Sequence, residues 1–97
     1  MTDRHSIADE FAHWIATDDG QKAHDAILMR ANLLHRAGWR HYGIGALWES
    51  ARYDYNLRLG PDAGFKMNNN YRSRMARYIM SRHPHLRGFF DTRELRS

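Results

Sequence analysis

The side chains able to do chemistry in this sequence are mostly cationic. Thirteen arginines and two lysines stand against eleven acids, seven histidines accompany them, and cysteine is absent. Without cysteine the chain has no disulfide, no thiolate nucleophile and no zinc–cysteine site. Arginine binds phosphates, carboxylates and aromatic faces alike, so the arginine excess predicts an anionic partner and leaves its class open.

The histidines and acids lack the spacing of a metal or catalytic site. His83 and His85 flank a proline with no third ligand beside them, and His24 and His35 lie eleven residues apart, too far to chelate one ion together. No phosphate-binding glycine loop and no nucleophile motif occurs. We therefore predict no metal, no cofactor, no catalytic residue and no enzymatic activity. A hydrolase would require an unexpected acid cluster around Glu49.

The charge is divided unevenly along the chain. Residues 1–29 carry a net charge of −4, whereas residues 30–97 carry +8. Between Asp62 and Asp91 there is no acid, yet this stretch contains one lysine and five arginines. Such a segment needs solvent or an anionic partner, unless the acidic N-terminal third folds against it.

Four helices and one short β-hairpin are expected to position these residues. Apolar side chains at helical spacing predict helices at 6–17, 21–37, 43–56 and 70–82, and alternation around a Pro/Gly turn predicts a hairpin at 57–68. Ser6 is expected to cap the first helix and Gly38 to end the second. The absence of valine also favours a mainly α chain, and the length of 97 residues predicts a single domain. Phe89 and Phe90 would dock on the core or on a second chain.

The order helix, glycine turn, helix, hairpin resembles a winged helix-turn-helix. The apolar positions of that family's helix pair are matched by Leu33, Ala37, Trp39, Ile44 and Leu47. Leu34 departs from the pattern, since the family has a small residue there. The resemblance implies that residues 1–97 form a single winged-helix-like domain, that the third helix reads DNA and that the hairpin is the wing. It places the following side chains against DNA: Arg40, His41, Tyr42, Gly45, Ala46 and Glu49.

A second resemblance covers about residues 30–97. The phrases Tyr42 to Glu49, Phe65 to Tyr71, Ala76 to Tyr78, Pro84 to Phe90 and Arg93 to Leu95 resemble a family of small proteins encoded by bacteriophages and prophages. The resemblance implies a setting, the bacterial cytoplasm during infection or lysogeny. It implies no activity and transfers no site residue. No apolar run approaches the roughly 18 residues of a membrane span, so we expect a soluble protein.

Two functions fit these observations. The first is a DNA-binding regulator that uses a helix-turn-helix and a basic wing, and the second is an interaction protein or inhibitor that binds an acidic host or anti-phage-defence protein. Either could act as a homodimer, and RNA remains an open partner. Basic residues on one continuous face favour DNA, whereas scattered ones, or ones covered by the first helix, favour a protein. The candidate binding residues are Arg40, His41, Tyr42, Glu49, Tyr53, Arg58, Lys66, Arg74 and Arg77.

Overall fold

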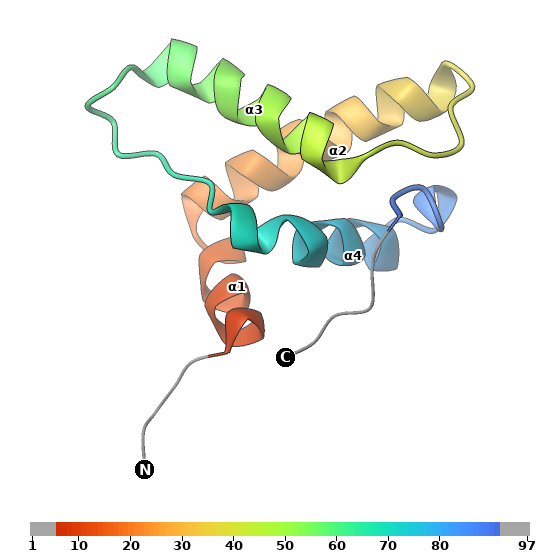
Figure 1. Ribbon diagram of the computed structural model, residues 1–97, viewed down its shortest axis with the longest axis horizontal. Helices are drawn as coiled ribbons and strands as arrows, with labels where there is room; N and C mark the ends of the chain where they lie inside the picture. The colour runs from red at the N-terminus through yellow and green to blue at the C-terminus, as the bar shows by residue number, and fades with distance from the viewer. Residues whose placement is uncertain (1–5, 92–97) are drawn as a thin grey trace.

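The computed structural model describes residues 6–91 as four α-helices with two short 3-10 turns, so the expectation of a mainly helical chain is confirmed (Figure 1). The elements are α1 (Ile7–Ile15), α2 (Asp18–Arg36), α3 (Ile44–Leu59), η1 (Asn69–Tyr71), α4 (Arg72–Arg82) and η2 (Pro84–Leu86). In Figure 1, α3 crosses in front of α2 along the upper edge, and α1 and α4 lie below them. The described body is flat, with principal extents of 49 × 34 × 18 Å.

Hydroxyl side chains cap the N-termini of α1 and α2, and a glycine lies in the first turn of α2. Ser6 Oγ accepts from the Asp9 backbone N–H at 3.1 Å, which confirms the expected cap of the first helix. Thr17 Oγ1 accepts from the Gly20 N–H at 3.1 Å, so the second helix begins three residues earlier than expected. A Cβ at Gly20 would overlap the Trp14 carbonyl oxygen. The two helices can therefore approach this closely only because residue 20 has no side chain.

The predicted β-hairpin is wrong, because α3 continues through its first strand. Within residues 6–91 no strand forms; α3 runs to Leu59, and Gly60 ends it with a φ of +81°. Leu57 is 68% exposed and Leu59 is 41% exposed, so their alternation with Arg58 reflects an outer helix surface and not a half-buried strand. Residues 61–68 return as an irregular loop. Without a hairpin there is no wing, and the winged-helix prediction is not supported.

The helix-turn-helix pattern does not describe how α2 and α3 pack. Leu33, Ala37 and Trp39 are exposed, and only Ile44 and Leu47 of the five pattern positions turn inward. Gly38 does follow the end of α2 with a φ of +102°, as predicted. The connection then takes seven residues, 37–43, where a helix-turn-helix uses three or four. The apolar spacing was present in the sequence, but a different face of α2 is buried.

The core lies where α2, α3 and α4 meet and is closed by α1 and η2. Trp48 is completely buried, and its ring centroid lies 6.0 Å from that of Trp14. Phe89 and Phe90 are only 1% and 3% exposed, so this pair packs inward and is not available to a second chain. The buried apolar residues are Phe11, Ile15, Ala23, Ile27, Ala31, Leu47, Trp48, Ala51, Met67, Met75, Ala76, Ile79, Leu86, Phe89 and Phe90.

None of the helices in residues 6–91 combines the length and apolarity required to cross a bilayer.

Candidate binding surface

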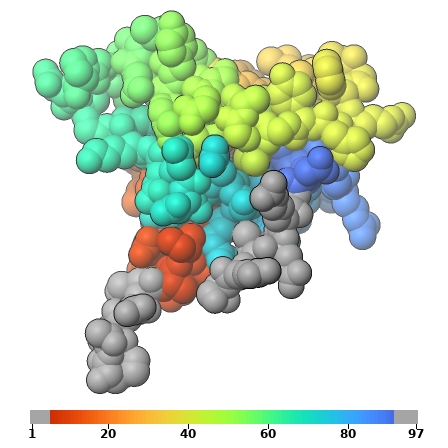
Figure 2. All heavy atoms as spheres, in the orientation of Figure 1, coloured from red at the N-terminus to blue at the C-terminus, as the bar shows by residue number. Residues whose placement is uncertain are grey.

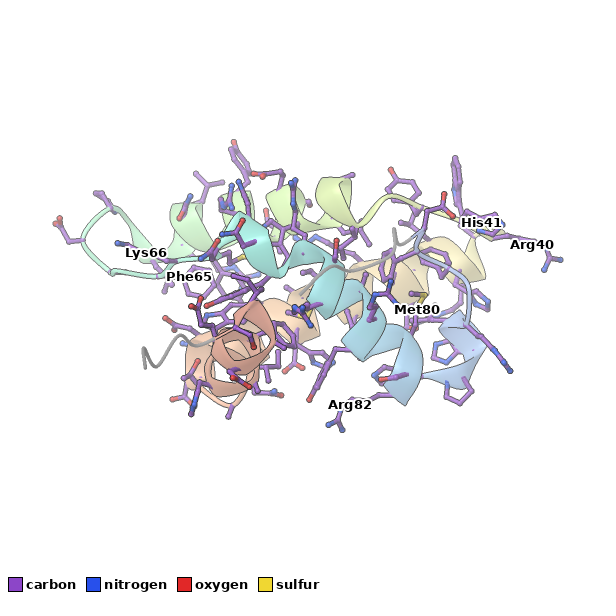
Figure 3. All side chains as sticks on the ribbon, turned by 60° about the horizontal axis from the view of Figure 1, so that its bottom comes forward. Arg40, His41, Phe65, Lys66, Met80 and Arg82 are labelled. Carbon is purple, nitrogen blue, oxygen red and sulfur yellow. The ribbon has the colours of Figure 1, made fainter. Side chains whose placement is uncertain are left out.

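The basic residues singled out by the sequence lie in three separate parts of the molecule. Figure 3 shows Arg40 and His41 at one end and Lys66 at the opposite end. In the space-filling view of Figure 2, the segment around residue 40 projects at the right, and the loop after α3 projects at the left. Arg74 and Arg77 lie on α4, beside α1. The sequence-predicted cations therefore do not form one continuous face.

The end that was expected to be a wing carries two exposed bases in different surroundings. The Arg58 guanidinium lies 5.4 Å from the centroid of the Tyr55 ring, in the last turn of α3. Lys66 lies in the returning loop and lines a shallow hollow with Arg52 and Phe65. Because the segment is not a hairpin, these bases do not form the strand pair that would enter a DNA groove.

Arg74 and Arg77 lie where the acidic first helix reaches α4. A hollow between the two helices is lined by Ala8 and Phe11 from α1 and by both arginines from α4. Arg74 is half-buried there, and Arg77 is exposed. Since Asp9 and Glu10 occupy the first turn of α1, the negative N-terminal segment lies close to this part of the basic segment.

Glu49 and Tyr53, both predicted to bind DNA or a partner, occupy the outer surface of α3. Tyr53 is 65% exposed. Glu49 is engaged by Arg52, whose Nη1 donates to the two carboxylate oxygens at 2.8 and 2.9 Å. Arg52 Nη2 donates to the Met67 carbonyl at 2.7 Å and also to the Asn69 side chain. Glu49 therefore holds the arginine whose guanidinium binds the returning loop to α3.

Two arginines that the sequence reasoning missed thus hold α3 in place. Arg52 has a local signal, since it follows Glu49 by three residues in a helix. Arg30 has none, because its side-chain partners come from another helix. It forms an ion pair with Asp54, and its Nε donates to Ser50 Oγ at 2.9 Å.

Arg40 and His41 meet the C-terminal segment in a shallow cationic hollow of about 250 Å³. We call this site the Arg40 hollow. Its lining consists of His35, Arg40, His41, His85, Arg87, Gly88 and Phe89. Five of these seven residues are basic and none is acidic. Within residues 6–91, neither the Arg40 nor the Arg87 guanidinium has a hydrogen bond or ion pair.

Backbone contacts tie together the two segments that form the Arg40 hollow. The Tyr42 N–H donates to the Phe89 carbonyl at 3.0 Å, and the half-buried Tyr42 ring meets Trp39 edge-on at 5.4 Å. His41 Nδ1 donates to the Gly88 carbonyl at 3.1 Å. Because Phe89 is buried in the core, its carbonyl is a fixed anchor for residues 37–43. The connection after α2 is therefore held against the protein although it has no regular structure.

A row of histidines runs from this hollow along the seam between α2 and α4. His35 and His85 have ring centroids 5.6 Å apart, His85 and His83 6.0 Å, and His83 and His24 6.1 Å. Among residues 6–91, no three His, Asp or Glu side chains are arranged to hold a metal ion. The sequence separated His24 and His35 from the other two histidines, and tertiary packing brought all four into one row.

His83, in the middle of the row, is the residue with an altered protonation equilibrium. Partial burial lowers its pKa below the ordinary value, and the neighbouring His24, His85 and Arg82 lower it further. His24 is buried and edge-on to the Tyr78 ring at 5.5 Å, with its Nδ1 beside the Asp25 carboxylate at 2.9 Å. The seam therefore favours an uncharged His83.

No family model, curated protein or solved structure matches the chain. The resemblance to a bacteriophage and prophage family thus stays a prediction. Its last phrase, Arg93 to Leu95, lies outside the described residues.

Proposed function

We propose that this protein is a non-enzymatic interaction protein that binds an acidic surface of another protein through the Arg40 hollow. The observation that carries the proposal is the meeting of two unpaired guanidinium groups and three imidazoles in a hollow that no carboxylate of residues 6–91 lines. An acidic partner would supply the missing anions. Arginine and aromatic side chains are also enriched among the residues that dominate binding energy in protein interfaces.

Trp39 supports the same surface by providing an apolar anchor. It is 53% exposed although tryptophan is usually well buried, and it adjoins Arg40 in a second shallow hollow lined by residues 37–41. A large aromatic ring beside unpaired cations is typical of a protein-binding site. In the phage setting, the partner would be a host or anti-phage-defence protein.

The distribution of the other cations supports a protein partner over duplex DNA. DNA binding rests on many phosphate contacts along a continuous basic surface. Here Arg40 and Arg58 lie at opposite ends of α3, and Arg74 lies beside the acidic first helix. The exposed surface of α3 presents Tyr53 and a Glu49 that is ion-paired with Arg52, and it is not a basic recognition surface. This is the scattered arrangement that favours the interaction protein.

The test compares two matched charge reversals in partner capture. Tagged wild-type protein, the double variant Arg40→Glu/Arg87→Glu and the control Arg58→Glu are incubated with nuclease-treated bacterial lysate, and captured proteins are identified and then titrated in purified form. We expect an acidic partner whose affinity falls by roughly tenfold or more in the double variant and changes little in the control.

Binding to labelled duplex DNA provides the opposing result. If the protein shifts duplex DNA at low salt, with an affinity that falls steeply as salt rises and that Arg58→Glu weakens as much as Arg40→Glu/Arg87→Glu does, the DNA-binding regulator is the correct function. If micromolar protein leaves the duplex unshifted, the DNA hypothesis fails.

A further inference from the structure

We propose that the Arg40 hollow recognises a phosphate-type oxyanion, namely a phosphomonoester group. This inference rests on the proposed function, because it names the chemical group by which the hollow would hold an acidic partner. Arg40 comes from the connection after α2, and Arg87 from the segment after η2. Two guanidinium groups from different segments can approach one anion from two directions, which suits the several oxygens of a phosphate better than a single planar carboxylate.

Two of the three histidines of the hollow, His41 and His85, each use one ring nitrogen in a hydrogen bond within residues 6–91 and leave the other for a ligand. His41 Nδ1 faces the Gly88 carbonyl at 3.1 Å, and a carbonyl only accepts, so Nδ1 carries the proton and Nε2 remains. His85 Nε2 faces the Asn32 side-chain oxygen at 2.7 Å, so Nδ1 remains. In the neutral ring these nitrogens accept from a protonated phosphate oxygen, and in the imidazolium they donate to an ionised one. Their hydrogen bonds fix ring orientation before a ligand arrives.

The charge of the hollow also favours a dianion over a monoanion. Arg40 and Arg87 supply two permanent positive charges, and no acid from the part of the chain that the structure describes lines the hollow to neutralise either of them. A carboxylate would balance one of these charges, whereas a phosphomonoester carries close to two negative charges at neutral pH. The volume of about 250 Å³ and the open shape admit such a group when it is attached to a larger molecule.

The experiment is a titration of the full chain, followed by NMR signals of the arginine side chains and histidine rings. The probes are inorganic phosphate, O-phosphoserine and, as the monoanion control, acetate at matched ionic strength. We expect phosphate and O-phosphoserine to shift the signals of Arg40, His41, His85 and Arg87, with an affinity for phosphate roughly tenfold or more above that for acetate. If inorganic phosphate binds saturably and O-phosphoserine does not, the hollow is a site for the free anion and the phosphomonoester assignment is overturned.

Substitutions separate this site from general attraction of anions. Arg40→Ala and Arg87→Ala should each weaken phosphate binding by roughly tenfold, Arg40→Lys should weaken it less, and the distant Arg58→Ala should leave it unchanged. Both arginines are exposed, and unchanged circular dichroism would verify that each variant is folded. Equal responses to phosphate and acetate, or an equal loss in Arg58→Ala, would overturn the inference. If the hollow fails to bind phosphate while partner capture still depends on Arg40 and Arg87, the oxyanion inference fails and the interaction function stands.

Discussion

Arginines at two regions of this protein have opposite uses. Around α3, the guanidinium of Arg30 binds Asp54 and Ser50. The guanidinium of Arg52 binds Glu49 and the Met67 carbonyl, so both positive charges are paired within the protein. At the Arg40 hollow, Arg40 and Arg87 meet three histidines and no described anion. The difference shows that the number of arginines overstates the positive charge available to a binding partner, because some arginines are paired within the protein. Two arginines of equal formal charge can differ in role, one stabilising the fold and the other available to bind a partner. The groups that surround each arginine determine its role.

The largest effect on stability is expected from Arg52, which links α3 to the returning loop. Arg52→Ala leaves the Met67 carbonyl and the Glu49 carboxylate without their donor, and the returning loop loses this side-chain hydrogen bond to α3. We expect the free energy of unfolding, measured by urea denaturation, to fall by about 2 kcal/mol. Arg58→Ala, six residues later on the same helix, is the control and should cost under about 0.5 kcal/mol. An equal fall in the free energy of unfolding in the two variants would contradict the distinction between a structural arginine and a surface arginine.

A smaller loss of stability is expected when the ion pair between Arg30 on α2 and Asp54 on α3 is removed. The Arg30 side chain is 16% exposed and that of Asp54 is 39% exposed, so solvent screens their ion pair only in part. We expect a double-mutant cycle with Arg30→Ala and Asp54→Ala to give a coupling free energy of about 1 kcal/mol. A coupling near zero would mean that the pair positions the helices without stabilising them.

At the Arg40 hollow, the same measurement should show almost no effect. Arg40→Ala and Arg87→Ala remove exposed side chains that have no described partner, so each should change the free energy of unfolding by less than about 0.5 kcal/mol. A clear gain in stability on removing both would indicate mutual repulsion in the hollow. A loss as large as that of Arg52→Ala would place these arginines with the structural ones and contradict the comparison.

A small effect that depends on pH is expected from the histidine row. Because the folded protein lowers the pKa of His83, the unfolded chain binds more protons as pH falls below the ordinary histidine value of about 6.5. Stability is therefore fully present above that value and declines as pH drops from there toward the lower pKa of the folded state. His83→Gln should flatten this decline in urea titrations between pH 7 and pH 5. His13→Gln, on α1, is the control. An unchanged slope in His83→Gln would contradict the assignment.

Local chemistry explains which parts of the fold could be predicted. Ser6, Gly38 and Pro84 act on the backbone within a few residues, and the helix boundaries near them agree with expectation to within about three residues. The hairpin failed because alternation over three residues, Leu57 to Leu59, is equally compatible with the exposed end of a long helix. The helix-turn-helix pattern failed because apolar spacing does not reveal which face of α2 meets the core.

For the candidate site, the sequence alone determined that the chain is helical, rich in arginine and divided into an acidic and a basic part. It also singled out Arg40 and His41. Only tertiary structure decided that His85 and Arg87 join them, since these two residues lie more than forty positions further along the chain, and that His35, five residues before Arg40, lines the same hollow. It also decided that Arg30 and Arg52 do not join them. The physical reason is that charge is a property of a residue, whereas its availability depends on which groups the folded chain brings within hydrogen-bonding distance.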